Sequence, residues 1–148
     1  MSYTEKLGPK VAELVQEQVL ATAMVVPPGA TLYKMYAPKS AAIALGGPIF
    51  AAFAAKMDGG PQGLAGQVPR QQGFLAVTPT RVLYLSKKAV GTAPKEVVTG
   101  WLRDAITLHY TSGEKWTYPG LALAFSDGSS CVVFGEKKWG LDEVGAVG

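Results

Sequence analysis

The sequence predicts an α+β fold in which about seven short antiparallel strands form a small curved sheet or a partly open barrel, closed by one C-terminal helix. Three observations support this prediction. The chain of 148 residues has the length of one domain, and its hydrophobic fraction of 48% is sufficient for a core. Its 18 glycines and 10 prolines are more helix breakers than a helical bundle usually carries. From residue 73 onward, runs of β-forming residues alternate with turn signals.

Residues 1–30 are predicted to form an N-terminal helix followed by a linker. Apolar side chains between Pro9 and Met24 recur at the three-four spacing of an amphipathic helix. Pro9 suits the first turn of that helix, and Pro27, Pro28 and Gly29 end it. The main domain then spans residues 31–148.

The main domain is predicted to begin with a short strand, Thr31–Ala37, and to carry an inserted helix at 41–56. The inserted segment is apolar and rich in alanine, but it is shorter than the roughly 20 residues that cross a bilayer. We interpret it as a helix that is buried or faces a partner; an interfacial membrane helix and a short membrane span are the alternatives. The small residues that would pack between copies of the chain are Ala41, Ala44, Ala51, Ala52 and Ala55.

A glycine-rich loop at 58–72 separates this helix from seven strand-like runs. The runs cover 73–78, 81–86, 96–102, 105–111, 115–118, 121–126 and 129–134. The first two are predicted to form a hairpin through Thr78, Pro79 and Thr80, and Asp127 with Gly128 predicts a second hairpin with a two-residue turn. A single helix is predicted over 136–147.

Three stretches carry a resemblance to a known family: GFLAVTPTRVLYLSKK at 73–88, VVTGWLRDAITLHY at 97–110 and LALAFSDGSSCVVFGEKKWGLDEV at 121–144. They resemble the bacterial PH-like, or GRAM-like, domain family. In that family an apolar strand leads into a threonine and an arginine that opens the next strand, here Thr78 and Arg81. The resemblance implies a non-enzymatic binding module for a partner protein or an anionic membrane surface. The alternative is an oligomerising structural protein with the alanine-rich helix as its interface.

Lys87, Lys88 and Lys95 lie on the two limbs of one predicted β connection. Ammonium groups within a Debye length of one another act jointly on one anionic group, such as a lipid headgroup phosphate. Basic loops between strands also bind phosphoinositides in eukaryotic PH domains. We therefore predict an anion-binding or lipid-binding edge at these lysines. The alternative is that they only keep an edge connection soluble.

The sequence offers little material for catalysis or for metal binding. His109 is the only histidine and Cys131 the only cysteine, which excludes a disulfide framework and a zinc site built on several thiolates. We expect no catalytic residues, no metal and no cofactor. The formal net charge of +3 is small, and nucleic-acid binding is not indicated. The polar N-terminus contains no secretory signal, so we expect a cytoplasmic protein, either free or peripheral to a membrane.

Overall fold

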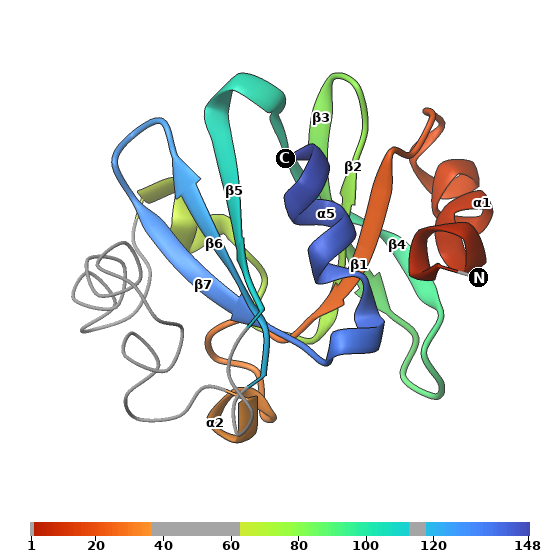
Figure 1. Cartoon of the computed structure of the whole chain (residues 1–148), viewed down its shortest axis with the longest axis horizontal. Coiled ribbons are helices and arrows are strands. Elements are labelled where there is room, and N and C mark those ends of the chain that lie inside the picture. The colour runs from red at the N-terminus through yellow and green to blue at the C-terminus, as the bar shows by residue number, and fades with distance from the viewer. Residues whose placement is uncertain (1, 37–62, 113–117) are drawn as a thin grey trace.

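The computed structural model describes residues 2–36, 63–112 and 118–148 (Figure 1). These residues form an α+β structure with two antiparallel sheets, one in the order β1-β2-β3-β4 and one in the order β5-β6-β7. The strands are β1 (Ala21–Val25), β2 (Gly73–Val77), β3 (Arg81–Lys87), β4 (Pro94–Leu102), β5 (Ile106–Thr111), β6 (Gly120–Phe125) and β7 (Ser130–Phe134). The helices are α1 (Tyr3–Val15), α2 (Tyr33–Tyr36) and α5 (Leu141–Val147), with short 3-10 helices η1 (Gly63–Gln67), η2 (Arg103–Ala105) and η3 (Lys137–Trp139).

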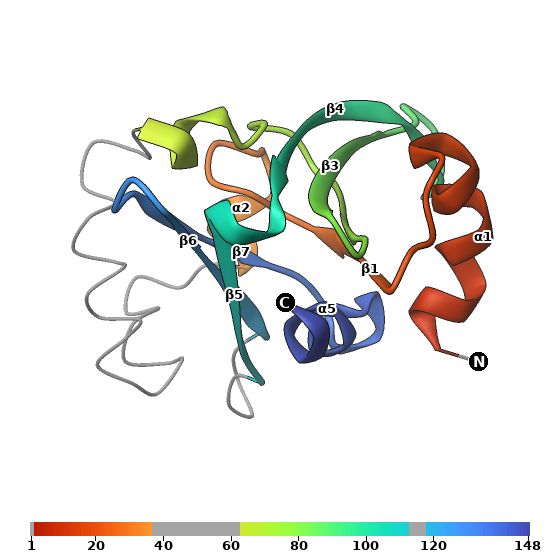
Figure 2. The same cartoon turned by 90° about the horizontal axis from the view of Figure 1, so that it is seen from above.

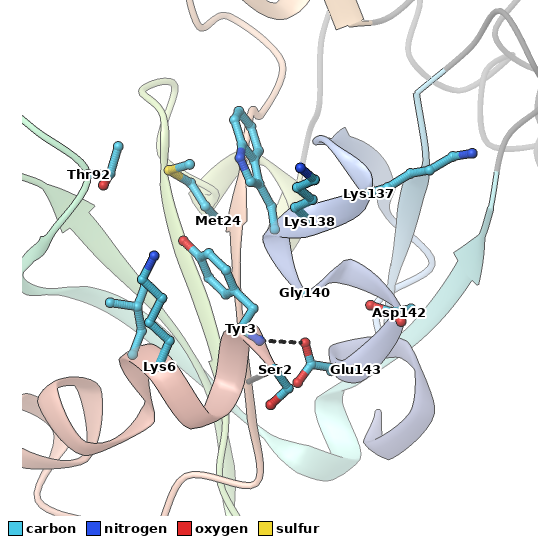
Figure 3. Close-up of a pocket in the computed structure, with 12 residues that line it drawn as sticks. Ser2, Tyr3, Lys6, Met24, Thr92, Lys137, Lys138, Gly140, Asp142 and Glu143 are labelled. Atoms are coloured by element: carbon cyan, nitrogen blue, oxygen red, sulfur yellow. Dashed lines mark hydrogen bonds between the residues drawn. The ribbon is translucent and has the colours of Figure 1, made fainter.

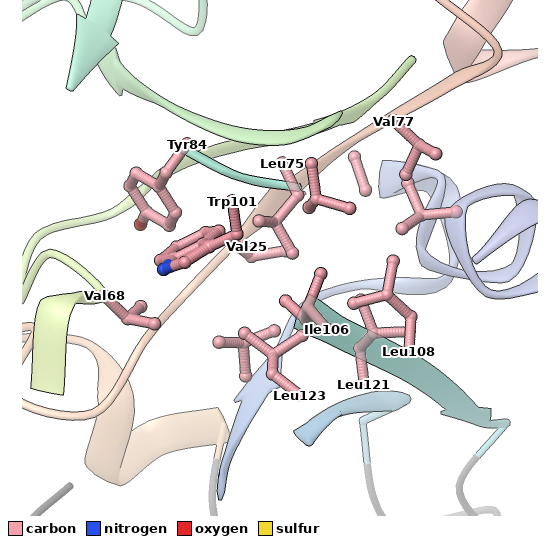
Figure 4. Packing of buried hydrophobic residues seen from close by; sticks show 14 of the residues in the cluster. Val25, Val68, Leu75, Val77, Tyr84, Trp101, Ile106, Leu108, Leu121 and Leu123 are labelled. Carbon is pink, nitrogen blue, oxygen red and sulfur yellow. The ribbon is translucent and has the colours of Figure 1, made fainter. Parts of the chain in front are cut away.

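The main core lies between the two sheets, which face each other across the buried side chains drawn in Figure 4. Alternate residues of the strands point into it, since successive side chains of a strand lie on opposite faces; β4 is the exception and contributes Trp101 alone. Leu75 of β2 and Leu121 and Leu123 of β6 are fully buried there. Figure 2 shows α5 at the open side between the sheets, where Leu141 closes the core.

The C-terminal segment forms two short helices instead of the single helix predicted over 136–147. Gly140 separates η3 from α5 and has a φ of 84°, a left-handed conformation that favours glycine. Gly145 then lets α5 approach β5 closely, because a Cβ at this position would lie 2.4 Å from Cβ of Tyr110. The two glycines therefore set both the start of α5 and its distance from the sheet.

Helix α1 covers the outer face of the four-stranded sheet. Its N-terminus is capped by Ser2 and Glu5, whose side chains each accept a hydrogen bond from the other's backbone N–H. Its apolar side packs on the outward-facing residues of the sheet: Val11 and Val15 contact the cluster that contains Phe74. The outward-facing apolar side chains of β1, β2 and β3 are thus buried beneath α1.

The predicted helix Pro9–Met24 is wrong at both ends. The helix begins at Tyr3 and ends at Val15, so that Pro9 lies inside it. Ala21–Val25 instead forms β1, which pairs with β2. All five residues of β1 are buried, because the core lies on one side of the strand and α1 on the other. A strand buried on both faces lacks the polar alternation that would identify it.

The predicted strand Thr31–Ala37 is also wrong over its described part, which contains the short helix α2. Its aromatic residues serve packing rather than a β ladder: the Tyr33 ring meets Phe134 edge-on, and the Tyr36 ring lies against Tyr118. The predicted helix at 41–56, with its alanine interface, lies outside the described residues. So does the predicted strand 115–118 except for Tyr118, which is in no strand.

Both predicted hairpins are present. In the β2–β3 hairpin, the Thr78 backbone N–H donates to the carbonyl of Arg81 at 2.9 Å. The β6–β7 hairpin has a three-residue loop, Ser126–Gly128, one residue longer than predicted, because Phe125 pairs with Ser129 through a 2.9 Å hydrogen bond. Gly128 has a φ of 87° and donates its N–H to the carbonyl of Phe125 at 3.0 Å, as in a type I turn followed by a bulge.

Candidate functional site

The three lysines predicted as an anion-binding edge lie on the β3–β4 hairpin. Lys87 ends β3, Lys95 lies in β4, and Lys88 begins the connection between them. Lys88 and Lys95 are exposed, and Lys87 is half-buried. Val90 stands at the tip of the connection with 89% of its surface exposed. The hairpin thus presents an apolar tip with lysines near its base.

Lys87 has a structural role within this hairpin. Its Nζ donates hydrogen bonds to the carbonyls of Lys88, at 3.0 Å, and of Gly91, at 2.8 Å. Gly91 has a φ of 91°, which turns the connection back toward β4. The Lys87 ammonium therefore holds the connection in shape. The exposed charged side chains next to the connection are those of Lys88, Lys95 and Glu96.

A groove of about 680 Å³ lies beside the hairpin, between α1 and the start of α5. Figure 3 shows Tyr3 and Lys6 on the α1 side, and Lys137 and Lys138 on the opposite side. Thr92 of the β3–β4 connection contributes to its wall. The remaining lining residues are Ser2, Leu7, Met24, Trp139, Gly140, Asp142 and Glu143. The groove thus joins apolar and aromatic lining residues with three lysines.

The first-turn amides of α1 are already occupied at this groove. The Glu143 side chain accepts hydrogen bonds from the backbone N–H groups of Tyr3 and Thr4, both at 3.2 Å. Ser2 Oγ accepts from the N–H of Glu5 at 3.0 Å. The positive end of the helix dipole therefore stabilises Glu143. An anionic ligand in the groove would be held by lysine side chains.

The Tyr3 phenol is a neutral hydrogen-bond donor within the groove. Burial raises the pKa of Tyr3, because the phenolate is poorly solvated there. Its hydroxyl thus stays protonated near neutral pH and can donate to an anion.

Sequence reasoning missed this groove, since its lining residues come from four separate parts of the chain. One signal was available: the run Lys137, Lys138, Trp139, which begins three residues after the end of β7, places two cations beside a large aromatic side chain. Arrangements of this kind suit amphipathic anions.

The single histidine and the single cysteine lie on opposite faces of the three-stranded sheet. Cys131 pairs with Leu123, and both side chains lie in the core between the sheets. His109 pairs with the neighbouring residue Ala122, whose side chain lies on the other face of the sheet, and His109 is exposed. Burial raises the pKa of the Cys131 thiol to about 12. A Cys-His nucleophile is therefore not formed. Among the described residues, no three His, Cys, Asp or Glu side chains gather in a way that could hold a metal ion.

No protein-family model, curated protein or solved structure matches this chain. Within the described parts of the chain, the longest apolar helices fall short of what a membrane crossing requires.

Proposed function

We propose that this chain is a non-enzymatic PH-like binding module that attaches to an anionic membrane surface through its β3–β4 hairpin. One observation carries the proposal: Val90 projects from the hairpin tip with 89% of its surface exposed, while Lys88 and Lys95 are exposed near the base. An apolar side chain can enter the boundary between headgroups and acyl chains. Lysines next to it are attracted to anionic lipid, each by about 1 kcal/mol.

The PH-like part of the proposal is supported by the order of the elements. A four-stranded antiparallel sheet is followed along the chain by a three-stranded sheet and then by α5. The resemblance in sequence covers the same elements from β2 onward. Helix α1 departs from that pattern and adds a cover to the outer face of the first sheet.

The fixed shape of the hairpin also supports attachment. The bonds from Lys87 Nζ to two carbonyls order the connection before it meets a ligand. A preordered loop loses less conformational entropy on binding than a flexible one. Val90 and the two exposed lysines can therefore engage a surface at the same time.

Vesicle sedimentation tests the proposal. The parent protein should bind vesicles of phosphatidylserine and phosphatidylcholine at low salt, and should not bind vesicles of phosphatidylcholine alone. The double variant Lys88→Gln/Lys95→Gln should bind the anionic vesicles about 2 kcal/mol more weakly, which is roughly 30-fold. Val90→Asp should weaken binding further, since its tip would carry a charge that the membrane repels.

Lys10→Gln is the matched control, because Lys10 is an exposed lysine of α1 that lies outside the hairpin and does not line the groove. It should change vesicle binding by less than Lys88→Gln does. The substituted positions, Lys10, Lys88, Val90 and Lys95, are all exposed, so the melting temperatures of the variants should stay close to that of the parent. Absence of binding to anionic vesicles at low salt, or equal weakening by Lys10→Gln and Lys88→Gln, would reject attachment through the hairpin.

A further inference from the structure

The groove between α1 and η3 has the lining of a site for an amphipathic anion. Leu7 and Trp139 offer half-buried apolar surface, and Met24 is buried. Lys6 and Lys138 stand on opposite sides of the groove (Figure 3). A volume of about 680 Å³ lies in the range of small-molecule sites. The groove can thus accommodate an anionic group together with an attached apolar part.

The charges of the groove favour a single phosphate group. Three lysines line it against the two carboxylates of Asp142 and Glu143, which leaves one excess positive charge. The Glu143 carboxylate is turned to the amides of Tyr3 and Thr4. The ammonium groups of Lys6 and Lys138 and the protonated Tyr3 hydroxyl are then the donors closest to a ligand in the groove (Figure 3). A phosphate ester accepts several such hydrogen bonds at once.

We propose that this groove binds one molecule of a phospholipid with a single-phosphate headgroup, such as phosphatidate, with the phosphate at the lysines and the glycerol and first acyl carbons against Leu7, Met24 and Trp139. Thr92 belongs both to the groove wall and to the β3–β4 connection. The groove therefore opens beside the hairpin that carries Val90. This inference rests on the proposed membrane attachment for the source of the lipid.

Calorimetric titration with short-chain lipids below their micelle concentration tests the site without a membrane. Dihexanoyl phosphatidate should bind saturably with one molecule per chain. Glycerol 3-phosphate has the same headgroup without acyl chains, and dihexanoyl phosphatidylcholine has the same chains with a zwitterionic headgroup. Both should bind at least tenfold more weakly. Equal affinity for either one and for phosphatidate would overturn the proposal, because the chains or the charge would then contribute nothing.

Variants assign the binding to the groove. Lys137→Gln/Lys138→Gln should weaken phosphatidate binding tenfold or more, since a hydrogen bond to a charged group is worth roughly a factor of ten. Tyr3→Phe removes only the hydroxyl and should weaken it severalfold. Lys10→Gln removes an exposed lysine charge of α1 outside both the groove and the hairpin and is the control, with affinity expected within about twofold of the parent. A loss from Lys10→Gln as large as that from the double variant would place the binding outside the groove.

The two proposals fail in different ways. If the hairpin attaches to membranes but the groove binds no lipid, the parent will sediment with anionic vesicles while the titration with phosphatidate gives no heat. If the groove binds lipid but the hairpin does not attach, the titration will saturate while Val90→Asp leaves sedimentation unchanged. The first result overturns the groove proposal, and the second overturns only the proposed function.

Discussion

The β3–β4 and β6–β7 hairpins share one feature of their turns and differ in what surrounds their tips. Each connection contains one glycine with a left-handed backbone, Gly91 at a φ of 91° and Gly128 at a φ of 87°. In the β6–β7 hairpin, Asp127 accepts hydrogen bonds from the Leu64 N–H at 2.8 Å and from the Ser129 N–H at 2.9 Å. That tip is tied to η1. The β3–β4 tip projects Val90 into solvent instead.

This difference separates a hairpin that stabilises the fold from one that is available for binding. Asp127 holds η1 against the sheet, and Ser129 Oγ accepts a further hydrogen bond from the Ala65 N–H at 3.0 Å. Ala65 is fully buried in the main core. The β3–β4 connection is held by bonds within the hairpin: those from Lys87 Nζ to the carbonyls of Lys88 and Gly91, and that from the Lys88 N–H to the carbonyl of Ala93 at 3.0 Å. Val90 and Lys88 at this connection are exposed, so they contribute little to folding and are accessible from solvent.

The largest expected effect comes from replacing the glycine of the tied hairpin. Gly128→Val forces a β-branched residue into a left-handed backbone, and the bonds of Asp127 and Ser129 prevent the loop from relaxing. We expect a loss of about 2 kcal/mol, or about 4–8 °C in melting temperature. Gly91→Val has the same local strain in a loop that can rearrange, and should cost about half as much. Equal losses would show that the two tips are equally constrained.

The second effect depends on pH. Hydrogen bonds from the Ser129 hydroxyl and from the Leu64 and Ser129 amides hold the pKa of Asp127 below its usual value of 3.8. Because the pKa is lower in the folded chain, the stabilisation is present above the usual pKa and is lost as the pH falls through the folded value. Asp127→Asn should therefore melt below the parent near pH 7, and the gap should close toward about pH 2.

Thermal melting of the parent and Asp127→Asn over this pH range provides the measurement. The pKa of Glu17 is lowered as well, chiefly by hydrogen bonds from Thr80 and Arg81, and its acid sensitivity is common to both proteins. Only the difference between the two melting curves reports on Asp127. A difference that stays constant down to about pH 2 would mean that the carboxylate charge does not hold η1.

Sequence patterns predicted those parts of the fold that depend on neighbouring residues. The β2–β3 and β6–β7 hairpins follow from Thr78–Thr80 and from Asp127 with Gly128, where the turn residues themselves fix the backbone. β1 was missed because burial on both faces removed its polar alternation. Tyr33 and Tyr36 suggested a strand, but their rings pack as side chains of a short helix.

The two candidate sites differ in the same respect, namely whether their residues are close to one another in the sequence. Lys87, Lys88 and Lys95 are close in sequence and lie on one hairpin, so their common position could be predicted. The groove could not, because Tyr3 and Lys138 approach each other only after α1 and η3 pack at the same end of the sheet. Local patterns carry no information on such long-range packing.

The smallest expected effect on stability comes from Lys87→Gln, which tests whether the Lys87 side chain orders the β3–β4 tip. The substitution removes the hydrogen bonds from Nζ to the carbonyls of Lys88 and Gly91, which lie in solvent. The loss of stability should be about 0.5 kcal/mol, because exposed interactions of this kind contribute little. Hydrogen exchange at the amides of residues 89–92 should nevertheless become faster, since these bonds order the connection.

Lys88→Gln is the control for this prediction, because it removes the same charge without those bonds. It should leave hydrogen exchange at residues 89–92 unchanged. Lys87→Gln should also weaken vesicle binding more than Lys88→Gln, because it loses a charge and the preordered shape that presents Val90. If the two variants weaken binding equally and exchange alike, the Lys87 bonds do not order the tip. The β3–β4 connection would then act through charge alone.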